Sequence, residues 1–489
     1  MRARSFPLLL AAALSACGPA AVRVAYPAGD SPEDLAAAKA LSQLYLVFSP
    51  EDGDNDLGTF AAALDEGLRA RGGAVLAYRA AGPEADPFLA ELAPSAVLSA
   101  DLTLGPLERS DFEKEVKSKD KDGVETVRKD PFTRLTRRLS VSLRLTGPDG
   151  SGLGSRTVAA EESEEKSRAE APKVGESSWM GRHGEKLMKE AAKRAAAALP
   201  APRAVTRDRV LFVDKEDPAS KDASAKAQDG AWEDASALWA DRLAEGRGGW
   251  REVWNLGVAA EQRKAYAEAA RLYRKAGAEA SSDTAAAQVP FSEAAADASR
   301  GAALFARSES AAAFFARPTA VLPYSDDTTS VDGPANLRRL TAAALRRGGW
   351  AVADVEATDR LLRRHGYSQG GQLKRADPAD LAAWTGAERL FFGDVSEFRN
   401  VMLGFLGRRE VVGTLRLWDA GPGAEVYSVE KSAVTQDGTL DGADATGRLA
   451  GQLGKALFEA WSGKPLGAES ALWVVRALQG LPLRPPTKR

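Results

Sequence analysis

Leu44-Tyr45-Leu46-Val47-Phe48 is a short apolar run with aromatic and β-branched side chains, and it ends at Ser49-Pro50. This length and composition are typical of a buried β-strand. A helical spacing of apolar residues follows and stops at Gly72-Gly73. A strand is then expected over 74–78, a helix over 83–92 and a strand over 96–104. The order is βαβαβ, which predicts an α/β domain.

An antiparallel pair completes this first domain. Apolar side chains alternate with Ser and Arg over 139–145, and Gly147-Pro148-Asp149-Gly150 turns the chain towards a strand over 155–160. Such alternation predicts one buried and one solvated sheet face. A helix over 176–199 then closes the unit before Pro200.

The same order of elements returns near the carboxyl end, which indicates an internal duplication. A strand over 319–323 precedes a helix that again stops at a double glycine, Gly348-Gly349. The remaining elements expected there are a strand at 350–355, helices at 357–364 and 378–385, strands at 389–395, 411–418 and 425–432, and a helix at 446–461. We therefore predict an α/β (α+β) protein in which two similar small βαβαβββα domains flank an all-α segment.

The segment between the two copies resembles a tetratricopeptide repeat. Asn255-Leu256-Gly257 begins one unit, and Ala259, Tyr266, Ala269 and Tyr273 have counterparts one period of about 34 residues earlier, at Ala225, Trp232, Ala235 and Trp239. The aromatic residues fill the spaces between helices in such units, or they line a concave peptide-binding surface. The candidate partner-binding residues are Trp232, Trp239, Trp254, Tyr266 and Tyr273.

The amino terminus has the pattern of an export signal. Arg2 and Arg4 precede an apolar run over 6–13, which is too short to span a bilayer. The ending Leu14-Ser15-Ala16-Cys17 resembles the lipobox of bacterial lipoproteins, which implies that Cys17 receives diacylglycerol and becomes the first residue of the mature chain. Gly18 after it implies passage to the outer membrane. The alternative is an ordinary cleaved signal with a chance cysteine.

Composition limits the class of protein. The chain has 489 residues, 27% charged and 44% hydrophobic, and a net charge of -2 with both signs interspersed. This composition is typical of globular domains and argues against nucleic acid as a partner. We expect a signal peptide at 1–16, a flexible tether at 17–40, α/β domains at 41–214 and 317–465, helical repeats at 215–316 and a carboxyl-terminal tail at 466–489. Cys17 is the only cysteine, so stability must come from packing.

Catalytic motifs are missing from the sequence. His183 and His365 lie far apart without metal-ligand spacing, and no glycine-rich phosphate loop is present. We therefore expect a protein that is not an enzyme and that needs no cofactor. Acidic loops after the first strand of each copy are either solvated turns and helix caps or a Ca²⁺ or Mg²⁺ site. The candidate carboxylates are Asp52, Asp54, Asp56, Asp326 and Asp327.

Two segments at corresponding junctions of the copies have opposite character. Residues 113–129 are densely charged with alternating signs, which indicates a solvated strand extension or a recognition hairpin. Residues 401–407, Val-Met-Leu-Gly-Phe-Leu-Gly, are apolar, which indicates core packing of a hairpin or contact with a partner or membrane.

The carboxyl-terminal copy resembles a family of envelope proteins. The motifs that carry this resemblance are Pro318-Thr319-Ala320-Val321-Leu322-Pro323, Gly366-Tyr367, Trp384-Thr385-Gly386-Ala387-Glu388-Arg389-Leu390-Phe391 and Leu415-Arg416-Leu417-Trp418-Asp419. They look like the small lipoproteins encoded beside the curli-type secretion channel lipoprotein, which share a small α/β domain with the amino-terminal domain of TolB. The resemblance implies a role in envelope assembly.

These observations predict a lipid-anchored scaffold that faces the periplasm from the outer membrane and contacts other envelope proteins. The expected role is that of an accessory in assembling a secretion or surface-polymer machine. The first alternative is a metal-binding or small-ligand-binding lipoprotein, or an enzyme, that uses the acidic loops. The second alternative is a structural lipoprotein associated with the cell wall. The oligomeric state stays open.

Overall fold

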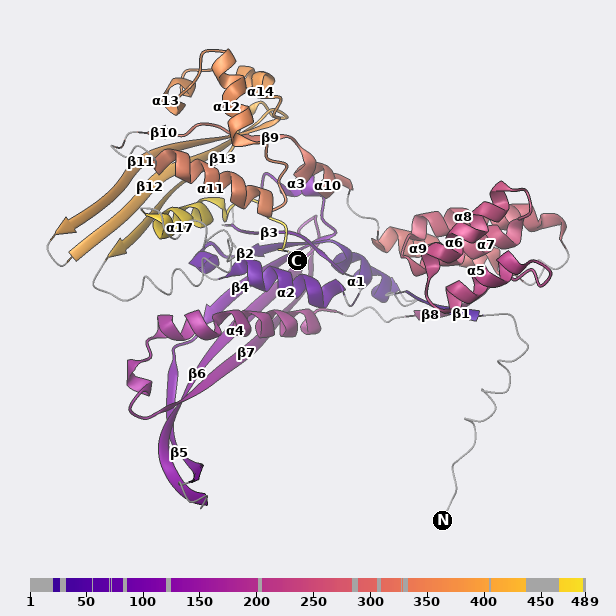
Figure 1. The fold of residues 1–489 in the computed structure, drawn as a ribbon, viewed down its shortest axis with the longest axis horizontal. Coiled ribbons are helices and arrows are strands. Elements are labelled where there is room, and N and C mark those ends of the chain that lie inside the picture. The colour runs from indigo at the N-terminus through magenta and orange to yellow at the C-terminus, as the bar shows by residue number, and fades with distance from the viewer. Residues whose placement is uncertain are drawn as a thin grey trace. The chain divides into compact units, whose positions relative to one another are not determined.

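The computed structural model describes residues 21–26, 32–54, 56–69, 71, 73–81, 86–119, 125–200, 205–283, 289–305, 309–326, 328, 333–403, 406–436 and 466–486. Its fold is mixed α/β, with a helical segment in the middle of the chain, as predicted (Figure 1). Contacts divide the chain into a helical unit, drawn from 1–42 and 201–307, and an α/β unit, drawn from 43–200 and 308–489.

The first sheet of the α/β unit has six strands. Its order is β3-β2-β4-β6-β5, and β7 also pairs with β6. Strand β2 runs parallel to β3 and β4, whereas β4, β5 and β7 each pair antiparallel with β6. The strands are β2 (Leu44–Phe48), β3 (Val75–Ala80), β4 (Ala96–Leu104), β5 (Glu108–Lys119), β6 (Glu125–Thr146) and β7 (Gly152–Ser167).

The first half of the α/β unit also contains helices, two of which pack against each other. Helix α2 (Leu57–Arg69) approaches α4 (Glu176–Ala198) closely, since a Cβ on Gly67 would lie 2.8 Å from the Cβ of Ala196. The apolar stripe predicted around Phe60 is fully buried. The shorter elements are the 3-10 helices η1 (Pro50–Asp54) and η2 (Ala171–Lys173) and helix α3 (Leu89–Leu92).

The second sheet repeats this layout with five strands. Strands β9 and β10 run parallel to β11, and β11, β12 and β13 form an antiparallel meander. The strands are β9 (Thr319–Val321), β10 (Ser325–Asp326), β11 (Arg389–Leu403), β12 (Leu406–Asp419) and β13 (Ala424–Gln436). Its helices are α10 (Glu309–Ala316), α11 (Gly333–Arg347), α12 (Val355–Arg364), α13 (Gly370–Leu373), α14 (Pro378–Thr385) and α17 (Gly467–Leu478).

Two expectations for this half are wrong, and one falls outside the described residues. The expected strand at 350–355 is reduced to an isolated bridge between Thr319 and Val352, because α12 already begins at Val355. The expected tail at 466–489 contains α17, whose Trp473 and Val474 are fully buried against the sheet. The helix expected at 446–461 lies outside the described residues.

The helical unit contains more of the chain than the sequence suggested. Strand β1 (Ala21–Tyr26) pairs antiparallel with β8 (Val205–Val210), and helix α1 (Pro32–Ser42) also belongs to this unit. The expected flexible tether at 17–40 is therefore wrong where it is described, because backbone pairing orders its first part. The other elements are α5 (Pro218–Gln228), α6 (Trp232–Ala244), α7 (Trp250–Gln262), α8 (Tyr266–Glu279), η3 (Ala280–Ser282) and α9 (Phe291–Phe305).

Small residues allow the helices of this unit to pack closely, as expected. A Cβ on Gly257 of α7 would lie 2.7 Å from the ring of Tyr273 on α8. A Cβ on Gly301 of α9 would lie equally close to Tyr266. The paired helices are observed, and their assignment to the tetratricopeptide family stays a prediction.

Both long hairpins of the α/β unit occupy the corresponding junctions noted in the sequence. The charged segment forms β5 and the start of β6, and Val127 there is 55% exposed, so the strand extension is confirmed. Of the apolar segment, residues 401–403 end β11 and residues 406–407 begin β12, with Met402 opposite Gly407, whereas residues 404 and 405 and the side chains of 401–407 lie outside the described part of the chain. Within the described residues, no helix is long and apolar enough to cross a bilayer.

Candidate functional site

The predicted acidic residues of the first loop serve the local fold. Asp52 accepts hydrogen bonds from the backbone N–H groups of Ser49 and Leu102, each at 3.2 Å. Asp56 caps α2, because its two oxygens accept from the backbone N–H and the hydroxyl of Thr59 at 3.0 and 2.7 Å. The capping role fits Asp56, but a solvated turn is wrong for Asp52, which is buried and accepts from the backbone of Leu102 in β4.

In the second acidic loop, one of the two candidate carboxylates also makes hydrogen bonds within its own loop. Asp326 is exposed and accepts hydrogen bonds from the backbone N–H and the hydroxyl of Thr328. The side chain of Asp54 and the whole of Asp327 lie outside the described part of the chain. Among the described residues, no three His, Cys, Asp or Glu side chains are grouped so that they could hold a metal ion.

Asp52 predicts a pH dependence of stability. Burial raises the pKa of its carboxyl from 3.8 to about 6, although the backbone hydrogen bonds oppose this shift. The folded state therefore binds the proton more tightly, so this contribution to stability is complete below pH 3.8 and is lost as pH rises through about 6. We expect Asp52→Asn to flatten the unfolding free energy over that window, measured by urea denaturation. An unchanged slope would contradict the assignment.

The aromatic residues predicted to bind a partner lie inside the helical unit. Trp239, Trp254, Tyr266 and Tyr273 are buried, and Trp232 is partly buried. The rings of Trp254 and Tyr273 lie 4.8 Å apart. The prediction that these side chains form an open surface is therefore wrong for the four buried residues, and they act as packing between helices.

One face of these helices holds an extended segment of the same chain. Asn255 of α7 accepts a hydrogen bond from the backbone N–H of Phe212 at 2.9 Å and donates to its carbonyl at 2.7 Å. The indole N–H of Trp254 donates to the carbonyl of Val210 at 2.8 Å. Leu211 between them is buried in the helical core. The helices thus bind the backbone of residues 210–212 through side chains.

An arginine next to this segment enters a charged pocket. Arg209 is 2% exposed and donates to Glu261 of α7 at 3.1 Å and to Asp297 of α9 at 2.9 Å. The hydroxyl of Tyr273 donates to Glu261 at 2.6 Å. Arg207 also approaches Asp297, at 3.4 Å. The pocket therefore surrounds one buried guanidinium with two carboxylates.

The two carboxylates of this pocket differ in their electrostatics. Burial, together with the neighbouring Asp297, raises the pKa of Glu261 to about 8. Burial also opposes ionisation of Asp297, but hydrogen bonds from Arg209 and Arg300 lower its pKa overall. Arg209 therefore favours the ionised form of Asp297, while burial favours the protonated form of Glu261.

The junction between the two sheets of the α/β unit forms a second candidate site. The segment after α17 pairs with the edge strand β3, because Tyr78 and Leu483 exchange two backbone hydrogen bonds at 2.8 and 2.9 Å. The backbone N–H of Ala80 donates to the carbonyl of Gln479 at 2.7 Å. On the other side, the indole of Trp350 donates to the carbonyl of Pro482 at 2.8 Å.

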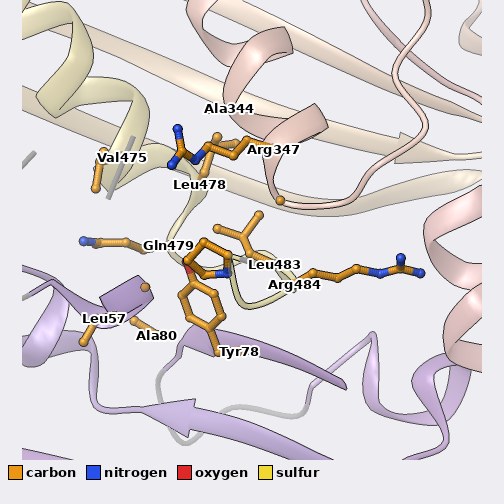
Figure 2. Close-up of a pocket in the computed structure, with 13 residues that line it drawn as sticks. Leu57, Tyr78, Ala80, Ala344, Arg347, Val475, Leu478, Gln479, Leu483 and Arg484 are labelled. Carbon is orange, nitrogen blue, oxygen red and sulfur yellow. The ribbon is translucent and has the colours of Figure 1, made fainter. Parts of the chain in front are cut away.

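A small pocket opens beside this segment. Figure 2 shows Leu483 and Arg484 passing between Tyr78 of the first half and Arg347 of the second. The cavity has a volume of about 60 Å³, whereas pockets for small-molecule ligands have volumes of about 300 Å³ or more. The pocket can therefore hold a few water molecules, and its walls are part of the contact between the halves.

Charged residues from both halves meet on another side of the junction. Arg389 is fully buried and donates to Glu91 of α3 at 2.8 Å and to Asp419 at 3.0 Å. Arg317 donates to Glu91 and Asp419 at 2.6 Å and to Glu388 at 2.8 Å. Three of these residues, Glu388, Arg389 and Asp419, belong to the motifs that carry the family resemblance.

No protein-family model matches the chain, and neither does any curated protein sequence. Parts of the chain are similar to solved structures. A lipoprotein from Neisseria meningitidis, GNA1162, is 19% identical over 30% of this chain and 99% of its own, with a TM-score of 0.25. The PelC dodecamer from Paraburkholderia phytofirmans is 18% identical over 34% of this chain and 89% of its own, with a TM-score of 0.22.

A minor lipoprotein from Acinetobacter baumannii is 13% identical over 32% of this chain and 91% of its own, with a TM-score of 0.17. Similar structures thus include bacterial lipoproteins. Scores this low do not place the chain in a family, and they carry no argument about its function.

Proposed function

We propose that this chain is a lipid-anchored, non-catalytic scaffold of the bacterial envelope. It faces the periplasm from the outer membrane and contacts other envelope proteins as an accessory in assembling a secretion or surface-polymer machine. The observation that carries this proposal is the place of β1. It begins four positions after Cys17, the residue of the lipobox-like motif, and it pairs with β8 inside the helical unit.

Under this proposal, the lipid on Cys17 lies a short stretch of chain away from the helical unit. Four residues span at most about 14 Å when fully extended. An acylated Cys17 therefore holds the helical unit close to the membrane surface. Gln262 of α7 strengthens this link, since its side chain donates to the backbone carbonyl of Arg23 in β1 at 2.8 Å. A scaffold that presents helices near the bilayer fits these contacts.

Cys17→Ala tests the anchor directly. We expect the wild-type chain to incorporate a radioactive or clickable fatty acid and to remain in the membrane fraction after a salt wash. The variant should incorporate no label, because it lacks the thiol that is acylated. Membrane-bound variant together with unlabelled wild type would refute lipid anchoring. Ser15→Ala is the matched control and should leave the label unchanged.

Three measurements distinguish the scaffold from the two other functional hypotheses. A scaffold should crosslink to specific envelope proteins, identified by mass spectrometry. A structural cell-wall protein should instead co-sediment with purified peptidoglycan. A ligand-binding protein should give a saturable heat signal when titrated with Ca²⁺ or Mg²⁺, and Asp326→Asn should abolish that signal.

A further inference from the structure

We propose that the face of α7–α9 that holds residues 209–212 is a binding site for an extended segment of a partner protein. The segment that fits has an arginine followed three residues later by an aromatic side chain. In this structure the chain's own Arg209-Val210-Leu211-Phe212 occupies the site. The inference rests on the proposed scaffold function, because it names the kind of partner segment that such a scaffold would bind.

The backbone contacts of the site are those of peptide recognition. The side-chain amide of Asn255 both accepts from and donates to the backbone of one residue, Phe212, and Trp254 donates to the carbonyl of Val210. These hydrogen bonds are made to main-chain atoms of the bound segment, so they do not depend on most of its side chains. Residues 211–214 have neither helical nor strand structure. The side chain of Asn255 therefore supplies the hydrogen-bond partners that a helix or strand would otherwise give to the backbone of Phe212.

The side-chain contacts supply the specificity. Asp297 and Glu261 lie on different helices and converge on the guanidinium of Arg209, whose planar fork can serve two carboxylates at once. The ring of Phe212 lies against Trp250 and Trp254, with ring centroids 4.9 and 6.2 Å apart. A lysine would offer only a point charge at this position, so the charge complementarity favours arginine.

The occupying segment is separate in the chain from the helices that bind it. Residues 209–212 precede α5, whereas their binding partners lie on α7 and α9, 38 to 88 residues later. Leu211 belongs to the core of this unit, whose other members lie on α5 to α9 and are mostly alanines and aromatic residues. A competing segment must therefore supply an apolar side chain at the position of Leu211. Displacement of β8 would also release β1, which pairs with it.

A labelled peptide tests the site in the full-length chain. The probe is a fluorescein-labelled peptide with the sequence of residues 205–213. The receptor is the purified full-length chain in detergent with Arg209→Ala and Leu211→Ala, which weaken the occupying segment and leave Asn255, Glu261 and Asp297 intact. We expect this variant to bind the probe at least about tenfold more tightly than the wild type, because its site is no longer filled.

Two controls define the site. Asn255→Ala in the same background should weaken binding of the probe about tenfold, and so should replacing the arginine of the probe by lysine. Absence of saturable binding, or equal binding of the lysine probe, would overturn the proposal. Concentration-dependent dimerisation of the variant would show that a second copy takes the site, and it would overturn the assignment to a different partner.

A measurement on the wild type does not depend on the variant's folding. Millimolar unlabelled peptide should accelerate hydrogen exchange of the chain's own amides at 205–212 at least about threefold, because the segment is displaced. Unchanged exchange would overturn the proposal. The peptide experiments give the same readout with Cys17→Ala, so a failure of lipid anchoring is distinguishable from a failure of this site.

Discussion

Removal of residues 480–489 is expected to destabilise the α/β unit by about 5 kcal/mol. Leu481 is fully buried in the core shared by both halves, and Leu483 packs against the same core. The truncation also removes the two backbone bonds to Tyr78 and the acceptor of the Trp350 indole. The midpoint of urea denaturation, followed by tryptophan fluorescence, should fall accordingly.

A shorter truncation provides the control. Removal of 487–489 leaves every one of these contacts in place and should change the unfolding free energy by less than about 0.5 kcal/mol. Leu483→Ala should give an intermediate loss of about 1 to 2 kcal/mol, because the backbone bonds remain. If the long truncation cost no more than the short one, the carboxyl-terminal segment would not join the two halves.

Local patterns predicted the elements of the α/β unit well. Strand β2 has the expected bounds, Leu44–Phe48, and α14 has the expected bounds, Pro378–Thr385. Apolar runs bounded by proline or glycine determine such elements through nearest-neighbour chemistry. The repetition of that order also predicted two similar halves correctly in outline.

Contacts between distant segments could not be predicted in this way. Leu483 lies in a proline-rich stretch, and its pairing partner Tyr78 is separated from it by about four-fifths of the chain. Local periodicity carries no information about such a pairing. The segment expected as a tail instead contains a residue that pairs with the edge strand β3, about 400 positions earlier in the chain.

The helical unit shows the same limit for a candidate site. Aromatic spacing places Trp254 and Tyr273 on facing helices, but it cannot reveal that residues 209–212 cover them. A weak signal was present, because Arg209 directly precedes the apolar run Val210-Leu211-Phe212. In the sequence, Asn255 is recognisable only as part of a repeat motif. Its paired bonds to a backbone become visible only when the segment's position is known.

Arg389→Met is expected to destabilise the α/β unit by about 4 kcal/mol at pH 7. The guanidinium is fully buried, lies 4.0 Å from the ring centroid of Phe314 and donates to the backbone carbonyl of that residue at 2.7 Å. Methionine replaces much of the volume but none of the donors. Asp419, which is 4% exposed, would then keep only Arg317 as a charged partner, beside the backbone N–H of Gly421 at 2.8 Å.

The pH dependence of this loss separates its electrostatic part from its packing part. Burial opposes ionisation of Asp419, but hydrogen bonds from Arg317 and Arg389 lower its pKa overall. Its contribution is therefore present above the usual carboxyl pKa and is lost as pH falls. The cost of Arg389→Met should shrink as pH falls below 3.8, whereas a pure packing defect would be insensitive to pH. Arg399→Met, an exposed position on the same strand, should cost less than about 0.5 kcal/mol at either pH.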